Sequence, residues 1–142
     1  MMIYLAADYA RKHEMQGCRD VLESMGHKVT ARWIDNDDSI EDAGGTGVGI
    51  DDANRMYYSQ FADKDFEDID ASEVFILFTT GALSRGGRHT EFGRAQAKGK
   101  RLIIIGPREH VFHCTQEVSH YPAWRSFVVD CATSFWSGKK DG

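Results

Sequence analysis

The sequence predicts a small three-layer α/β fold with a mainly parallel sheet of four or five strands. The main evidence is the order of segments in residues 73–105: an apolar run, a glycine-rich turn, a helix-like stretch and a second apolar run. That order is typical of a parallel βαβ unit. The chain has 142 residues and a hydrophobic content of 42%, which is enough for one core. We therefore expect a single domain over residues 1–142.

The expected elements alternate along the chain. Short apolar runs predict strands at residues 3–7, 28–34, 73–78 and 101–105, and the imperfect alternation of 28–34 favours a place near the sheet edge. Helical spacing predicts helices at about 10–25, 50–71 and 88–99. A last helix is indicated by an apolar stripe: Trp124, Phe127, Val128, Cys131 and Phe135.

Residues 35–49 form an acidic, glycine-rich segment between the second strand and the second helix. Long loops of this kind in compact domains often form lids or contact ligands. The glycines at 44–49 superficially resemble a phosphate loop, but the segment lacks the Lys-Ser/Thr of a P-loop. We expect a mobile loop here and no nucleotide P-loop.

Charge and composition exclude several classes of function. The net charge of −5 argues against a nucleic-acid or anionic-membrane binder, which needs a basic face. No apolar stretch approaches the roughly 20 residues of a membrane span, and residues 1–8 meet an acid too early for a signal peptide. The three cysteines, an odd number without a CxxC pair, favour a reduced, cytoplasmic setting.

Glu91 is the residue with the clearest chemical signal. It follows Gly86 and Gly87, which allow a ligand to approach the backbone closely. We expect it in the first turn of the crossover helix, where the helix N-terminus favours an ionised carboxylate. Ligands of parallel α/β folds bind at the carboxyl ends of the strands. Glu91 is therefore a candidate nucleophile.

Asp65 is the second candidate, because it continues a helical row of apolar residues that should face the core: Ile50, Ala53, Tyr57 and Phe61. A carboxylate on such a face is unfavourable unless it has a partner or lines a cleft. A helix cap or a salt bridge is the structural alternative. Two carboxylates near the aromatic rings of Tyr4 and Tyr9 suit the cleavage of a glycosidic bond.

The chain resembles the nucleoside 2-deoxyribosyltransferases and the related deoxynucleoside 5′-monophosphate N-glycosidases. Those families begin with Ile-Tyr-(Phe/Leu)-(Ala/Gly), which matches residues 3–6, and carry Gly-x-x-x-Glu-(Ile/Leu/Phe)-Gly, which matches residues 87–93. Their Asp-Leu-like pair ahead of a strand corresponds to Asp65 and Phe66. The resemblance covers residues 3 to about 106 and implies a flavodoxin-like fold.

The resemblance also implies roles for individual residues. Glu91 corresponds to the nucleophile that forms a glycosyl-enzyme, Asp65 to the acid that positions it or moves the proton, and Tyr4 to a hydroxyl near the nucleophile. Tyr9 corresponds to an aromatic residue that borders the base. We therefore expect a retaining enzyme without a cofactor that cleaves or exchanges the N-glycosidic bond of a (deoxy)nucleoside or its 5′-monophosphate. Family members form dimers or larger assemblies, so a homodimer or larger homo-oligomer is expected.

The expected substrate-binding residues surround the same strand ends: Asp8, Tyr9, Arg11, Ser84, Gly86, Gly87 and Arg88. Arginines fit phosphate oxygens well, so Arg11, Arg85 and Arg88, together with Lys12, favour a nucleotide over a free nucleoside. Each one alone is more readily explained as a solvated surface cation. Transferases of the family often have an additional Asp ahead of the glutamate, where this chain has Ser-Arg-Gly-Gly at 84–87, and this argues against base exchange.

Other interpretations of the sequence stay open. The enzyme could act on NAD or a nucleotide signal, or the scaffold could be a non-catalytic nucleotide sensor. Four possible metal ligands lie within eleven residues: His110, His113, Cys114 and His120. Their spacing is loose for zinc, so we interpret them as a histidine-rich loop near the sheet edge or a subunit contact, and we expect no metal site.

Overall fold

A parallel sheet lies at the centre of the computed structural model, which describes residues 1–36, 51–80 and 86–133. Within these residues the sheet has five strands in the order β2-β1-β3-β4-β5, and each neighbouring pair is parallel. The strands are β1 (Met2–Ala6), β2 (Lys28–Val29), β3 (Val74–Phe78), β4 (Arg101–Ile105) and β5 (Val118–Tyr121). The expected parallel α/β class is confirmed.

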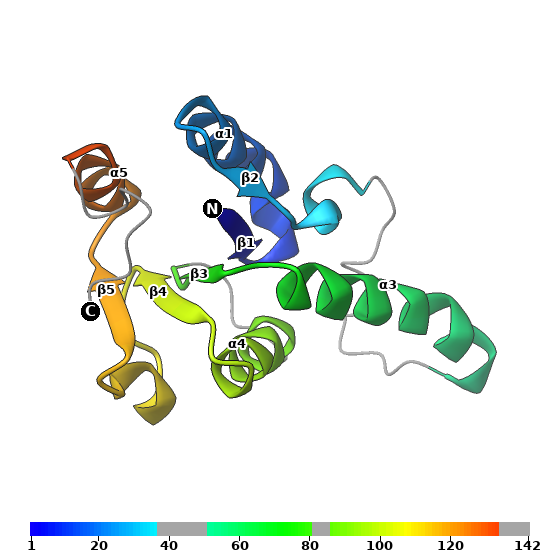
Figure 1. Ribbon diagram of the computed structural model, residues 1–142. Coiled ribbons are helices and arrows are strands. Elements are labelled where there is room, and N and C mark those ends of the chain that lie inside the picture. Colours follow the sequence, from blue (N-terminus) through cyan, green and yellow to red (C-terminus); the bar gives the residue numbers. More distant parts are fainter. Residues whose placement is uncertain (37–50, 81–85, 134–142) are drawn as a thin grey trace.

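Helices cover both faces of the sheet. In Figure 1, α1 (Lys12–Ser24) and α5 (Trp124–Thr133) lie on one side, and α3 (Asp52–Asp70) and α4 (Gly87–Ala97) lie on the other. The central strands are therefore apolar along their length, as expected for strands buried on both faces. All five residues of β3 are buried. This three-layer arrangement matches the expectation.

Two strand predictions need correction. The predicted strand 28–34 is a strand only at Lys28–Val29, because Arg32–Asp35 form a 3₁₀ helix in which Trp33 turns inward and donates its indole N–H to the Leu5 carbonyl at 2.8 Å. β5 lies in a segment that was expected to be a loop. It is an edge strand, and three of its four residues are only partly buried, so it lacks the continuous apolar run of a central strand.

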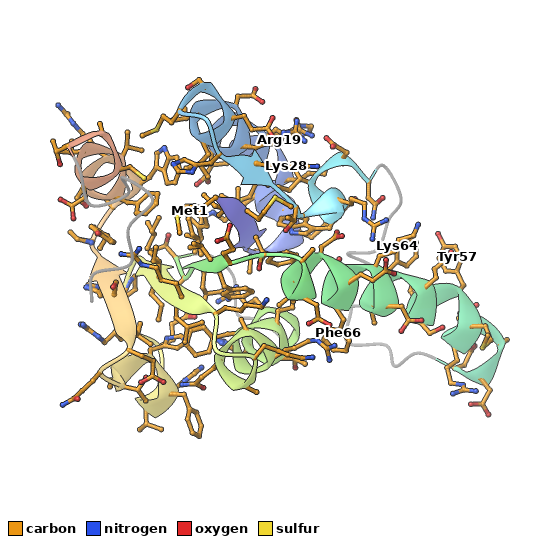
Figure 2. The ribbon with its side chains drawn as sticks, viewed as in Figure 1. Met1, Arg19, Lys28, Tyr57, Lys64 and Phe66 are labelled. Atoms are coloured by element: carbon orange, nitrogen blue, oxygen red, sulfur yellow. The ribbon has the colours of Figure 1, made fainter. Side chains whose placement is uncertain are left out.

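The apolar row predicted along α3 contacts the core only at the C-terminal half of the helix. Phe61 and Ile69 are buried, whereas Met56 is 71% exposed and Tyr57 is 47% exposed. The N-terminal half of α3 extends beyond the other elements that Figure 1 labels, and Tyr57 lies on this projecting part in Figure 2. The sequence pattern therefore predicted correctly which side of α3 faces inward. It was wrong about the N-terminal half of the helix, which the core does not reach.

Some predicted features lie outside the described residues, namely most of the 35–49 loop, Ser84 and Phe135. No helix in the described parts of the chain combines the length and the apolar composition that a membrane crossing requires.

The ends of β3 and β4 approach each other closely at Gly106. This residue has a φ of 114°, and a Cβ atom there would lie 2.5 Å from Oγ1 of Thr79. The Thr79 hydroxyl donates a hydrogen bond to the Pro107 carbonyl at 2.7 Å. Only glycine fits this backbone conformation and this contact without strain. The contact fixes the carboxyl edge of the sheet, where the loops leave toward the candidate site.

Candidate active site

Glu91 and Tyr4 form the centre of the candidate site. Helix α4 begins at Gly87, preceded by Gly86 in the left-handed conformation with a φ of 113°. The helix directs Glu91 toward β1, where the Tyr4 hydroxyl donates a hydrogen bond to Oε2 of Glu91. Tyr4 is fully buried and stacks on Phe75 with a centroid distance of 5.5 Å. Its packing therefore fixes the position of the hydroxyl that holds the carboxyl group.

The protonation of Tyr4 follows from the same burial. Desolvation raises the pKa of Tyr4 well above its usual value, and the charge of Glu91 raises it further. The phenol stays protonated at physiological pH, so it remains a hydrogen-bond donor to Glu91.

Asp65 lies on the inward side of α3, close enough to Glu91 for the two acids to interact. Burial raises the pKa of Glu91 to about 8, and the charge of Asp65 also raises it, against the lowering effect of the Tyr4 hydrogen bond. Burial also raises the pKa of Asp65 to about 7, and the charge of Asp68 adds to this effect. Two interacting carboxyl groups with such values titrate as a pair and share protons near neutral pH.

The expectation that the helix N-terminus keeps Glu91 ionised is wrong. The helix starts at Gly87, so Glu91 is its fifth residue and lies beyond the first turn, where the helix dipole acts most strongly. Burial and the neighbouring acid dominate and favour the neutral form. The predicted trio of Tyr4, Asp65 and Glu91 is nevertheless brought together.

Asp68 is a further acid of the site that the sequence analysis missed. It is 6% exposed, and its carboxylate accepts the backbone N–H of Arg32 at 2.9 Å and the Arg32 Nε at 2.9 Å. It lies one helical turn after Asp65, and its charge acts on both Asp65 and Tyr4. A signal was present, because Phe61, Asp65 and Asp68 follow an i, i+4, i+7 pattern on one face.

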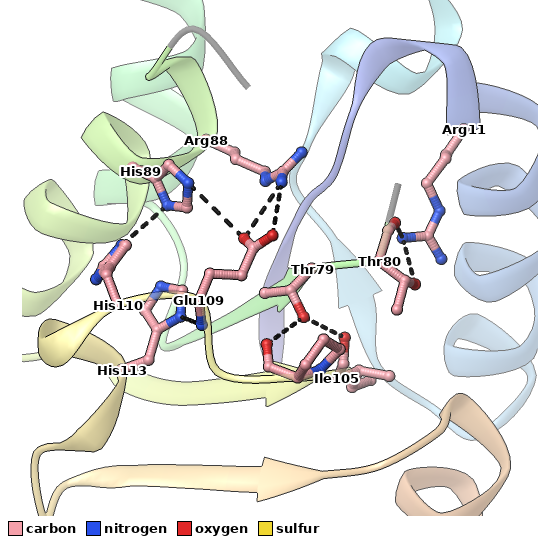
Figure 3. A network of polar contacts seen from close by, with 10 residues as sticks. Arg11, Thr79, Thr80, Arg88, His89, Ile105, Glu109, His110 and His113 are labelled. Carbon is pink, nitrogen blue, oxygen red and sulfur yellow. Dashed lines mark hydrogen bonds and ion pairs between the residues drawn. The ribbon is translucent and has the colours of Figure 1, made fainter. Parts of the chain in front are cut away.

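The residues after β1 line the carboxyl edge of the sheet. Asp8 caps the 3₁₀ helix Tyr9–Arg11 by accepting the Ala10 N–H at 3.0 Å. The Tyr9 hydroxyl donates to the Asn36 carbonyl at 2.8 Å. Arg11 reaches across to the end of β3 and donates to the Thr80 carbonyl, as Figure 3 shows. Tyr9 and Arg11 thus lie at the edge where a ligand of this fold class binds.

Arg88 occupies a more enclosed position than the sequence suggested. It is 5% exposed, and its Nη2 atom lies 3.1 Å and 3.2 Å from the two carboxylate oxygens of Glu109, which follows β4. This ion pair connects the start of α4 to the loop after β4 (Figure 3). Part of the Arg88 guanidinium is therefore engaged with Glu109. Arg11 is engaged as well, because its Nε and Nη2 atoms donate to the two carboxylate oxygens of Glu14 at 3.0 Å and 2.6 Å.

The four possible metal ligands of the histidine-rich stretch do not lie together. His110 and His113 meet His89 of α4, with one ring nitrogen of each within 4.8 Å of the others. The other two residues have different neighbours: His120 Nε2 lies 2.6 Å from the Gly106 carbonyl oxygen, and Cys114 is exposed, with its thiol 3.8 Å from the His110 carbonyl oxygen. The four residues weighed from the sequence therefore do not form one cluster, and the cluster that does form includes His89, which the sequence analysis did not consider.

The raised pKa values of Asp65 and Glu91 predict that the protein loses stability as the pH rises. Both carboxyl groups bind protons more tightly in the folded state than in the unfolded chain, where their pKa values are about 4. Their contribution is therefore fully present below about pH 4 and is lost as the pH rises through about 7 to 8. The free energy of unfolding, measured with urea between pH 5 and 9, should fall more steeply for the wild type than for Glu91→Gln. Parallel curves for the two proteins would contradict the raised pKa of Glu91.

Comparison with solved structures shows that the fold extends over nearly the whole chain. The CMP N-glycosidase BcmB of Clostridium botulinum is similar at 20% identity and a TM-score of 0.57, over 93% of this chain and 99% of its own. A 2-deoxyribosyltransferase of Bacillus psychrosaccharolyticus is similar at 16% identity and a TM-score of 0.64, over 89% and 90%. No family model and no curated protein sequence matches the chain. The chain therefore has the nucleoside deoxyribosyltransferase-like fold that the sequence resemblance implied.

Proposed function

We propose that this protein hydrolyses the N-glycosidic bond of a nucleoside 5′-monophosphate, with Glu91 as the nucleophile. The observation that carries this proposal is the buried Tyr4–Glu91 hydrogen bond next to a second carboxyl group, Asp65. Enzymes that break a glycosidic bond usually use two carboxyl groups, one as the acid and the other as the nucleophile or base. The fold supports the proposal, because one similar structure is a CMP N-glycosidase and another a 2-deoxyribosyltransferase.

The first step is a displacement at the anomeric carbon of the sugar. Tyr4 holds Oε2 of Glu91, so Oε1 is the oxygen available for attack. A bond forms between Oε1 and the anomeric carbon, the bond from that carbon to the base nitrogen breaks, and its electron pair leaves with the base. Asp65 in its protonated form donates the proton that the departing base takes up.

The second step resolves the glycosyl-enzyme. Water attacks the anomeric carbon, its proton passes to the Asp65 carboxylate, and the Glu91 carboxylate is released. Two inversions leave the configuration of the sugar unchanged. Raised pKa values keep one proton in the pair near neutral pH, and the higher pKa of Glu91 places it mainly there. The reactive form arises when this proton passes to Asp65 and leaves Glu91 ionised.

Arg11 and Tyr9 support a nucleotide substrate. Arg11 lies where the ends of β1 and β3 meet. Its guanidinium pairs with the exposed carboxylate of Glu14, and the oxygens of a 5′-phosphate can take the place of that carboxylate. Tyr9 is half-buried at the same edge and can stack on the base. The sequence Ser-Arg-Gly-Gly at 84–87 lacks the additional Asp of many transferases, which favours water over a second base as the acceptor.

We also propose that two copies associate through the projecting half of α3. Tyr57 packs edge-on against both Tyr58 and Phe61 with centroid distances of 5.2 Å, and Met56 beside them is largely exposed. Exposed apolar side chains that lie together, as Tyr57 and Met56 do, are typical of protein–protein contacts.

All three cysteines are unpaired, which supports a reducing, cytoplasmic setting.

The base-release reaction tests the assignment of Glu91. Wild type and Glu91→Gln are incubated with a panel of nucleosides, nucleoside 5′-monophosphates and NAD, and free base is measured by chromatography. Loss of the nucleophile should lower base release by roughly a thousandfold or more. Glu117→Gln on the exposed surface near β5 is the matched control and should keep wild-type activity. Equal release by Glu91→Gln and wild type would remove Glu91 from the mechanism, and release of nicotinamide alone would redirect the substrate to NAD.

A substitution at Asp68 tests how the carboxyl pair is tuned. Asp68→Asn removes a negative charge that raises the pKa of Asp65 and leaves Arg32, which lowers it, without its partner. Both changes lower the pKa of Asp65, which must be protonated to react, so the alkaline limb of the kcat/KM profile should move to lower pH and the maximum rate should fall. Asp63→Asn on the exposed side of α3 is the control. An unchanged profile for Asp68→Asn would show that Asp68 has no influence on the pair.

The association of two copies is tested by sedimentation at several protein concentrations. Tyr57→Glu places a charge beside Met56 on the projecting half of α3 and should yield a monomer. Arg55→Gln on the same half of the helix lowers the net charge by the same amount and is the control. A wild-type protein that sediments as a monomer at all concentrations would contradict the proposal.

A further inference from the structure

A cluster of three histidines lies on the side of α4 away from Glu91. His89 belongs to the first turn of α4, and His110 and His113 follow β4, at the beginning and within the 3₁₀ helix Val111–Cys114. One ring nitrogen from each residue lies within 4.8 Å of the others. Figure 3 shows the three rings next to Glu109. His89 and Glu91 are two residues apart on the helix, about 200° around its axis, so they face opposite sides.

Two ring nitrogens of the cluster have no hydrogen-bond partner among the described residues. His113 is fully buried, and its Nε2 atom is one of them; the Nδ1 atom of His110 is the other. Buried polar atoms in native proteins are nearly always paired, because an unpaired one loses its bonds to water without compensation. Two such atoms in one cluster leave unused capacity to bind a ligand.

The three imidazole rings pack closely against one another. The centroids of His110 and His113 are 3.8 Å apart, and those of His89 and His110 are 4.7 Å apart. The Nε2 atom of His110 lies 3.1 Å from the Nδ1 atom of His89, so at least one of these two nitrogens carries no proton. Neutral imidazoles offer lone pairs, which is the form that metal ions bind.

We propose that His89, His110 and His113 bind one zinc-type divalent transition-metal ion. Three imidazoles with a fourth position open to water are a known zinc arrangement, with Zn–N bonds of about 2.0–2.1 Å. The Oε1 atom of Glu109 lies 3.7 Å from Nε2 of His89 and pairs with Arg88, so it can orient a histidine ligand from outside the metal sphere. The ion joins the start of α4 to the loop after β4.

Binding requires a defined local rearrangement. Tetrahedral zinc ligands lie about 3.4 Å apart for bonds of that length, so the rings must close slightly from their spread of 4.8 Å. His113 Nδ1 now accepts the backbone N–H of Glu109 at 3.0 Å, which places the ring proton on Nε2. When Nε2 binds the metal, that proton moves to Nδ1 and the Glu109 N–H turns away. The metal-bound and metal-free forms therefore differ at this peptide.

The test is a metal titration of the full chain with any affinity tag removed and with prior dialysis against a chelator. Zn²⁺ is followed by calorimetry, Co²⁺ by its visible absorption, and thermal unfolding is recorded with and without Zn²⁺. We expect one equivalent per chain, an absorption spectrum of low-coordinate cobalt with nitrogen ligands, and a higher Tm with metal. His89→Asn and His110→Asn should each weaken binding about a hundredfold or more, and His13→Asn on the exposed surface of α1 should not.

Three results would overturn the proposal: no saturable binding, equal binding by wild type and His89→Asn or His110→Asn, or an equal loss in His13→Asn. Circular dichroism of each variant shows whether it is folded, and the variants at the two partly exposed histidines avoid a change at the buried His113. The proposal is independent of the glycosidase mechanism. Treatment with a chelator should leave base release by the folded enzyme unchanged, whereas it should remove the metal-induced rise in Tm.

Discussion

The hydrogen bond from Tyr4 to Glu91 is the contact on which the candidate site depends. It joins the middle of the first strand to the helix that follows the third, so it requires β1, β3 and α4 to be packed in their observed order. The phenol can hold the carboxyl group only because stacking on Phe75 and complete burial leave it one position. The core thus performs two tasks, since it stabilises the sheet and orients a reactive acid.

Burial also decides the charge of the site. A carboxyl group near a helix N-terminus gains some stability when ionised, but this effect fades beyond the first turn. Desolvation and a second acid nearby act on Glu91 more strongly and in the opposite direction. The result is a pair of acids that hold a proton near neutral pH, with Asp68 and Arg32 setting the balance from the adjacent turn of α3 and from the chain after β2.

The sequence predicted those features that arise from contiguous segments. β3 and β4 were identifiable because burial on both faces demands an unbroken apolar run, and Glu91 because its glycine loop lies beside it in the chain. Edge strand β5 was missed because its partly exposed residues need no such run. The histidine cluster was not recognised because His89 is 21 residues from His110 and meets it only through the packing of α4 against the loop after β4. Asp68 lay on a recognisable face, but its pairing with Arg32 depends on the tertiary fold.

Helix α4 carries Glu91 on one face and His89 on the other, and it is tied at its start to the loop after β4 through Arg88 and Glu109. Because these two groups point to opposite sides of one helix, the histidine side of α4 can be redesigned while the reactive carboxyl group keeps its surroundings. The α4–β4 junction is therefore a suitable place to attach this scaffold to a surface or to a second protein.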